Sequence, residues 1–236
     1  MAFHWQTFRT RALTAILFVA VMAAGLLISK WGFLLLFTVV HFGGWAEFLR
    51  LRRQFPDRSS TGISVGDLLG GGLYLTLPLF LLCDLRFDWL HTQTATGDAG
   101  LDDVTRLSLV LLLIFSIWIN DTMAYIVGSL IGKTPLSPIS PKKTWEGTAG
   151  GALLAVGVMS ALAWAVDPAL TRHAAAISAI AAITGTIGDL FESKLKRTAG
   201  VKDSGSFMPG HGGFLDRFDS LLFAAPCVWL YVALAL

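Results

Sequence analysis

The sequence predicts an all-α integral membrane protein, a polytopic bundle of about seven transmembrane helices with its N-terminus inside and its C-terminus outside. Of the 236 residues, 54% are hydrophobic and only 14% are charged, and the mean hydropathy is +0.65. Soluble domains carry about 25% charged residues. This composition excludes a soluble globular enzyme and a disordered chain, and two cysteines are too few for a disulfide scaffold.

Seven apolar runs are each about long enough to cross a bilayer. No run alternates with a period of two, and a backbone facing lipid must satisfy its own hydrogen bonds, so helices are expected. The runs are 12–28, 32–48, 65–83, 107–127, 148–166, 173–191 and 218–236. Glycine pairs such as Gly43-Gly44 and the run 70–72 predict close helix packing.

The first run resembles a signal peptide because Arg9 and Arg11 precede it. However, no small-residue cleavage site follows, and Lys30 comes directly after the run, so we interpret it as a retained helix. With the N-terminus inside, the inner segments carry 14 of the 18 Lys and Arg residues. Because inner loops are enriched in these residues, this distribution predicts the stated orientation.

The loop 132–147 contains three prolines, which prevent a regular helix through its middle. It also contains the adjacent Lys142 and Lys143, several hydroxyl groups and two glycines. These features are equally typical of a phosphate-binding loop and of a basic loop held at anionic lipid headgroups.

The sixth run continues into a polar segment with a helical pattern. Asp189, Glu192, Ser193 and Lys196 follow the spacing i, i+3, i+4, i+7 and therefore share one helix face. Acidic residues within apolar helices are costly and usually face a protein or water cavity. Further along, the glycine-rich stretch 209–213 leads to an Asp216/Asp219 pair at i and i+3.

Carboxylates at two helix ends, beside a loop rich in Gly and Lys, favour Mg²⁺ together with a polyphosphate. His211 has no His or Cys at a ligand spacing, so a zinc site is not expected. Its glycine-rich setting suits substrate contact and a structural role equally well. Asn120 and Asp121 lie in the fourth apolar run, where Asp121 could also serve only to bond across helices.

Residues 193–219 read S-x2-K-R-x4-K-D-x-G-x3-P-G-H-G-G-x2-D-R-x-D, which resembles the signature of phosphatidate cytidylyltransferases, also called CDP-diacylglycerol synthases. The segments N-D-x2-A-Y at 120–125 and S-P-x-K-T-x-E-G at 140–147 also resemble this family. Ser129 departs from the pattern, because members often carry Arg there.

The resemblance implies that CTP and phosphatidic acid give CDP-diacylglycerol and pyrophosphate, with Mg²⁺ as the cofactor and a second cation as an option. It implies a homodimer in the bilayer, expected in a bacterial inner membrane, with the active site facing the cytoplasm and no nucleic-acid partner. We expect residues 1–105 to form N-terminal transmembrane helices and 106–236 to form the catalytic region, with cytoplasmic loops at 128–147 and 192–217.

By position, Asp189 and Asp216 correspond to the metal-binding aspartates of that family. We expect the catalytic residues to be Asp189, Lys196, Asp216 and Asp219. Residues expected to bind CTP or its phosphates are Asn120, Asp121, Lys143, Thr144, Glu146, Arg197, Lys202, Asp203, His211 and Gly212. Two alternatives remain: a cytidylyltransferase for another lipid acceptor, and a non-catalytic membrane transporter or scaffold that uses Asp121 and Asp189 as an acidic relay.

Overall fold

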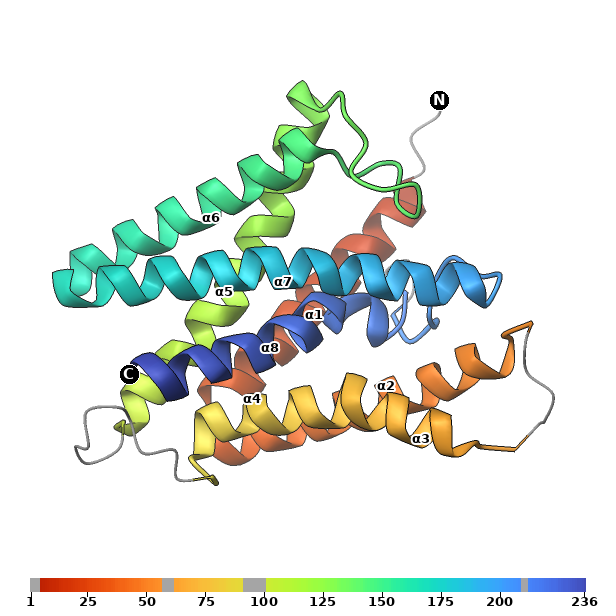
Figure 1. Ribbon diagram of the computed structural model, residues 1–236, viewed down its shortest axis with the longest axis horizontal. Helices are drawn as coiled ribbons and strands as arrows, with labels where there is room; N and C mark the ends of the chain where they lie inside the picture. The colour runs from red at the N-terminus through yellow and green to blue at the C-terminus, as the bar shows by residue number, and fades with distance from the viewer. Residues whose placement is uncertain (1–4, 57–61, 91–100, 209–211) are drawn as a thin grey trace. The chain divides into compact units, whose positions relative to one another are not determined.

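The structure, a computed structural model, describes residues 5–56, 62–90, 101–208 and 212–236, with side chains from Ala12 onward. Within these residues the chain is helical, without a β-strand, which confirms the all-α prediction (Figure 1). The elements are α1 (Trp5–Leu27), α2 (Lys30–Arg53), α3 (Val65–Gly71), the π-helix η1 (Gly72–Thr76), α4 (Leu77–Phe87), α5 (Asp103–Ile131), α6 (Trp145–Val166), the 3₁₀-helix η2 (Pro168–Leu170), α7 (Thr171–Thr198) and α8 (Leu215–Ala235).

Polar caps fix several helix starts a few residues before the apolar runs begin. The Ser29 hydroxyl accepts from Gly32 N at the start of α2, and the Thr144 hydroxyl accepts from Gly147 N at the start of α6. Asp102 accepts from Thr105 at the start of α5, and this interaction lowers the pKa of the Asp102 carboxyl. Such side chains satisfy backbone N–H groups that have no partner within the helix.

Six of the described helical segments are long and apolar enough to cross a membrane. They are Lys30–Arg53, Val65–Phe87, Asp103–Ile131, Trp145–Val166, Pro168–Thr198 and Leu215–Ala235. The described apolar part of α1, Ala12–Leu27, is shorter. Large apolar side chains on these helices are exposed, among them Leu153 (74%) and Val166 (83%), as expected for a lipid-facing surface. The chain is thus an integral membrane protein, while the count of seven and the orientation stay predictions.

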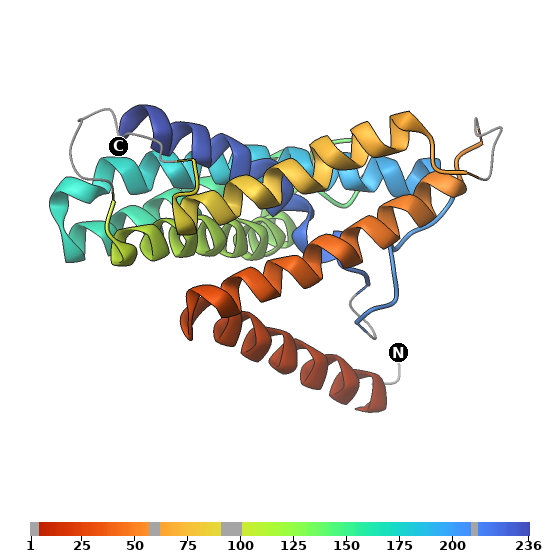
Figure 2. The ribbon, with the colours of Figure 1, turned by 90° about the horizontal axis from the view of Figure 1, so that it is seen from below.

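The chain forms two compact units. One consists of residues 1–79 and 195–218. In this unit α1 and α2 form a helical hairpin (Figure 2), and the buried core includes Phe33, Phe37 and Leu75. A Cβ added at Gly71 would overlap the ring of Trp45, which confirms the predicted close packing at this glycine.

The other unit consists of residues 80–194 and 219–236. Its most extensive helix pair is α5 with α6, and η2 reverses the chain from α6 into α7 (Figure 1). Two glycines of α6 allow the pair to approach: a Cβ at Gly147 or at Gly151 would overlap the backbone of α5. This close packing places the loop between the two helices beside the C-terminal half of α5.

Candidate functional site: a polar cavity and a carboxylate-anchored loop

A polar cavity of about 580 Å³ lies in the unit formed by residues 80–194 and 219–236. Three stretches that are distant in sequence contribute to it: the C-terminal half of α5, the loop before α6 with the start of that helix, and the middle of α7. The lining residues are Asn120, Asp121, Ala124, Tyr125, Gly128, Ser129, Ser140, Lys142, Lys143, Thr144, Thr148, Thr186 and Asp189. Five predicted site residues, Asn120, Asp121, Lys143, Thr144 and Asp189, therefore meet at one cavity.

The loop before α6 is held in place by its own backbone and by Glu146. Leu136 N donates to Lys143 O (2.7 Å), and Trp145 N donates to Thr134 O (2.9 Å), so the two arms of the loop pair. The Glu146 carboxylate accepts from Thr134 N and from the Thr134 hydroxyl (2.8 Å), as well as from Lys133 N. Glu146, predicted to contact substrate, thus anchors the loop that carries Lys143.

Two carboxylates, Asp121 and Asp189, and two lysines, Lys142 and Lys143, line the cavity. Lys143 forms an ion pair with Asp189, and both side chains keep about a quarter of their surface exposed (29% and 26%). Asp121 and Asp219 also interact electrostatically with Asp189 and Lys143. The Asp219 carboxylate accepts from Ser220 N (2.7 Å). Acidic and basic side chains thus meet at the cavity, which suits a phosphate ligand together with a cation.

Asn120 is nearly fully buried at the cavity wall, with 2% of its surface exposed. Its Nδ2 donates to Oδ1 of Asp121 (3.2 Å). Its Oδ1 is buried and accepts no hydrogen bond from any residue in the described part of the chain. Buried polar atoms are generally paired, so this carbonyl is a position where a ligand can bind.

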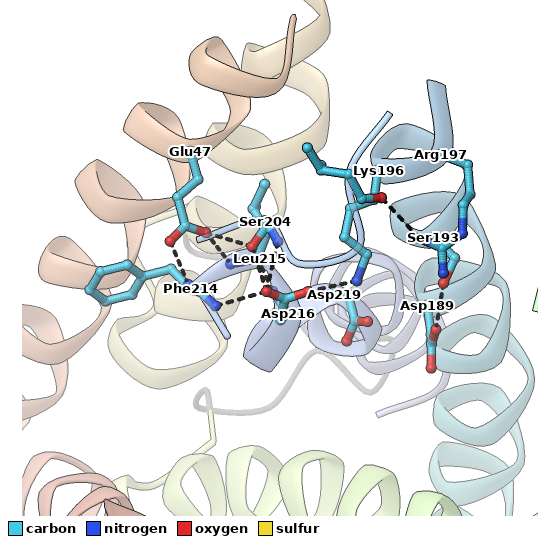
Figure 3. Close-up of polar contacts among 12 residues, drawn as sticks. Glu47, Asp189, Ser193, Lys196, Arg197, Ser204, Phe214, Leu215, Asp216 and Asp219 are labelled. Atoms are coloured by element: carbon cyan, nitrogen blue, oxygen red, sulfur yellow. Dashed lines mark hydrogen bonds and ion pairs between the residues drawn. The ribbon is translucent and has the colours of Figure 1, made fainter. Parts of the chain in front are cut away.

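The other unit contains a second polar group, which we call the Ser204 cluster: Glu47, Lys196, Ser204 and Asp216 (Figure 3). The Ser204 hydroxyl lies 2.8 Å from Oε2 of Glu47 and 2.9 Å from Oδ2 of Asp216. Lys196 Nζ donates to Oδ1 of Asp216 (2.6 Å). The predicted residues Lys196 and Asp216 are therefore direct partners.

Backbone amides complete the Ser204 cluster. Glu47 accepts from Phe214 N and Leu215 N, both at 3.0 Å, and Asp216 accepts from Gly213 N (2.7 Å) and Ser204 N (2.9 Å). A Cβ at Gly205 or Gly213 would overlap the Glu47 carboxylate, so glycine is required where the loop passes over it. Two carboxylates thus hold Ser204 and the C-terminal end of the loop between α7 and α8.

The remaining predicted residues lie around this loop. Arg197 is exposed and donates from Nη1 to Val201 O (2.9 Å), and Lys202 and Asp203 are exposed. Gly212 has a positive φ of 86°, and a Cβ there would overlap the Asp216 carboxylate. His211 lies outside the described residues.

Glu47 is the residue that the sequence analysis missed. It is 8% exposed and lies near the end of α2, within the run 32–48. An acidic residue in an apolar helix is a signal for function, the same signal that identified Asp121 and Asp189. The motifs at 120–125, 140–147 and 193–219 all lie in the C-terminal half of the chain, so they carry no information about Glu47.

Among the residues that the structure describes, no three His, Cys, Asp or Glu side chains are arranged to hold a metal ion. The Asp189 carboxylate nevertheless fits a partial Mg²⁺ site, because it borders the cavity beside Asp121 and several hydroxyl oxygens. Mg²⁺ commonly takes one or two carboxylates and completes its shell with substrate phosphates and water. Asp216 already accepts from Lys196 and three further donors, so a cation there would compete with Lys196.

Comparison with known proteins agrees with this chemistry. Residues 98–235 match the family model described as "Cytidylyltransferase family". The chain is 33% identical over 206 residues to a protein named phosphatidate cytidylyltransferase from Staphylococcus aureus (strain COL). This alignment covers 85% of this chain and 76% of the relative.

Two other relatives with the same name have higher identity over shorter alignments. The protein from Synechocystis sp. is 48% identical over 137 residues, which is 56% of this chain and 45% of the relative. The protein from Bacillus subtilis (strain 168) is 45% identical over 120 residues, which is 50% of this chain and 45% of the relative. These two alignments thus span less than half the length of each relative.

Proposed function

The chain belongs to the cytidylyltransferase family, and we propose that it is a phosphatidate cytidylyltransferase that converts CTP and phosphatidic acid to CDP-diacylglycerol and pyrophosphate. The observation that carries the proposal is the cavity, where Lys143, Asp121 and Asp189 meet although they come from three separate segments. A membrane enzyme suits this reaction because the acceptor lipid and the product both remain in the bilayer.

In the proposed reaction a phosphate oxygen of phosphatidic acid attacks the α-phosphorus of CTP. A new phosphorus–oxygen bond forms, the bond between the α-phosphorus and its bridging oxygen breaks, and pyrophosphate leaves with the electron pair. Because the nucleophile is already an anion, the protein mainly has to position two phosphates and offset their charge.

Lys142 and Lys143 would supply positive charge to the CTP phosphates at the cavity. The ion pair of Lys143 with Asp189 holds the lysine at the wall, and the hydroxyls of Ser140 and Thr148 add hydrogen-bonding groups there. Lys196, Arg197 and Lys202 are further proposed phosphate contacts. Ser129 also lines the cavity, where the family resemblance led to the expectation of Arg, so this chain would depend more on its lysines.

Asp189 and Asp216 are the proposed ligands of Mg²⁺, with a second cation as an option. When bound, the cation would neutralise phosphate charge and polarise the phosphorus–oxygen bonds. Asp189 borders the cavity and accepts from two side chains, Lys143 and Ser193, whereas Asp216 accepts from Lys196 and three further donors, so the fit is better at Asp189. Asp216 would first have to release Lys196, which would then be available for a phosphate.

We further propose a homodimer in a bacterial inner membrane, with the cavity open to the cytoplasm, where CTP is available. The excess of Lys and Arg in the predicted inner segments supports this orientation.

The test is to incubate the purified full chain in detergent with CTP labelled at the α-phosphate, phosphatidic acid and Mg²⁺. We expect a labelled lipid that migrates as CDP-diacylglycerol, together with unlabelled pyrophosphate. Labelled lipid only with another acceptor, such as a polyprenyl phosphate, would show a relative with different specificity. No labelled lipid with any acceptor would favour the transporter or scaffold alternative.

A further inference from the structure

We propose that Asn120 recognises the base of the nucleotide: its side-chain amide pairs with the Watson–Crick edge of cytosine and thereby selects CTP over UTP. This inference rests on the proposed function, because it takes the cavity to be the nucleotide site. A contact with the base would provide selectivity among nucleotides. The charged residues cannot provide it, because phosphate contacts are the same for every nucleoside triphosphate.

The Oδ1 acceptor of Asn120 has no partner among the described residues, and the residue lines the cavity. Each Asn amide has two N–H donors and one carbonyl acceptor. One N–H is used by Asp121 at 3.2 Å, whereas Oδ1 is buried without a partner among the described residues. With only 2% of its surface exposed, the side chain has little hydration to lose when a base takes its place beside it.

Asp121 determines which way the side-chain amide of Asn120 faces. An ionised carboxylate only accepts hydrogen bonds, so the nitrogen of the amide must face Asp121 and the oxygen must face away. Rotating the amide by 180° would place two oxygens against each other. Asp121 is therefore a positioning residue for Asn120, which cannot change its donor and acceptor pattern to suit a different base.

The fixed pattern matches cytosine and not uracil. Cytosine presents an amino donor at C4 beside the N3 acceptor, which complements Oδ1 and the remaining N–H of Asn120. Uracil presents a carbonyl at C4 beside an N3–H group, so both contacts would be repulsive. Selection between the two bases should be strong, because uracil would leave the buried amide of Asn120 without hydrogen-bond partners.

The cavity also has the length for this arrangement. Ala124 and Gly128 follow Asn120 at i+4 and i+8 along α5, so they lie on the same face, and both line the cavity. A rise of about 1.5 Å per residue separates Asn120 from Gly128 by about 12 Å along the helix. A Cβ at Gly128 would lie 3.1 Å from the Thr144 hydroxyl, so the lysine-bearing loop lies at that end. The base would bind near Asn120 and the phosphates near Lys143.

The experiment compares CTP, UTP and the triphosphate of pyrimidin-2-one riboside, which is cytidine without its 4-amino group. The kcat/KM of each is measured with phosphatidic acid and Mg²⁺ for the full chain in detergent. For the unchanged protein we expect CTP to exceed the analogue by about 10- to 100-fold, the range for a good bidentate contact. In Asn120→Ala and Asn120→Ser, the preference for CTP over the analogue should be lost, because CTP loses both base contacts while the analogue loses only the contact at N3.

Ser129→Ala is the matched control, since the Ser129 hydroxyl also lies at the cavity but donates to Tyr125 O (2.7 Å). It should keep the preference for CTP over the analogue. If the Asn120 variants lose rate but keep the preference, Asn120 does not read the base. If the unchanged protein transfers no cytidylyl group, the proposed function fails. The base contact is then judged separately by comparing the rise in Tm produced by CTP with that produced by the analogue, and equal rises would overturn it.

Discussion

The Ser204 hydroxyl lies 2.8 Å from the Glu47 carboxylate, although 157 residues separate the two in sequence. The same hydroxyl lies 2.9 Å from Asp216. A hydroxyl has one proton to donate, so it can serve only one of the two carboxylates at a time, while its backbone N–H serves Asp216 as well. This one serine thus connects α2, the loop after α7 and the start of α8.

We predict that Ser204→Ala destabilises the protein more than the same change at Ser206. Ser204 is fully buried, whereas Ser206 is exposed in the same loop. Removing the hydroxyl leaves two carboxylates with fewer donors, and a hydrogen bond to a charged group contributes about 1.5–3 kcal/mol. Thermal unfolding in detergent should show a lower Tm for Ser204→Ala and little change for Ser206→Ala. Equal Tm values for both variants would contradict a structural role of the Ser204 cluster.

We predict that Asp189→Asn removes nearly all cytidylyltransfer while the protein still folds. The change removes a charged oxygen ligand from the cavity and releases Lys143 from its ion pair. Loss of metal-based charge stabilisation corresponds to several kcal/mol, or a rate loss of roughly a thousandfold. Asp216→Asn should behave alike if Asp216 also binds the cation. Turnover close to that of the unchanged protein at saturating Mg²⁺ would rule out either residue as a ligand.

Lys143→Ala should raise the KM for CTP and lower kcat, because phosphate contacts strengthen as charge moves to the leaving pyrophosphate. The expected loss in kcat/KM is about 1.5–3 kcal/mol, and the KM for phosphatidic acid should change much less. Lys133→Ala is the matched control, since Lys133 is exposed at the other end of the same loop. A selective rise in the lipid KM would instead support the view that these lysines hold anionic headgroups.

We predict that Glu146 and Thr134 support activity through the same interaction, so that the effects of changing them are not additive. Their side chains are 2.8 Å apart, and Glu146 also accepts from two backbone amides of the same loop. If Glu146 anchors the loop, Glu146→Gln and Thr134→Val should each reduce kcat/KM for CTP, and the double variant should be no worse than about the larger single effect. Additive losses in the double-mutant cycle would instead assign Glu146 a direct contact with substrate.

Cysteine labelling tests the orientation. In a background without Cys83 and Cys227, cysteines at the exposed positions Thr134 and Ser206 should react only with reagent on the cytoplasmic side. A cysteine at Ala169, in the exposed turn between α6 and α7, should react only from the opposite side. The unequal distribution of Lys and Arg leads to this expectation. Reaction of Ser206→Cys from the outer face would reverse the topology and remove the cytosolic supply of CTP.

The sequence by itself determined the helical class, the membrane setting and the family, because apolar length and fixed motif spacing are local properties that need no contacts. It also predicted the residues of the cavity, since motifs at 120–125 and 140–147 carry their chemistry in their side chains. The helix ends predicted from the apolar runs were less accurate. Caps such as Thr144 and Asp102 extend helices beyond the apolar runs by satisfying amides that hydropathy does not report.

Only the tertiary structure decided which polar groups are partners. Glu146 and Lys143 belong to the same motif, and the sequence predicts CTP binding for both. In the structure the Glu146 carboxylate holds the loop, while Lys143 borders the cavity. Glu47 belongs to no motif, and its role follows from the amides of Phe214 and Leu215, more than 160 residues away. The free carbonyl of Asn120 likewise depends on what packs around it. Hydrogen bonds require distance and direction in space, and neither is encoded in the spacing of residues along the chain.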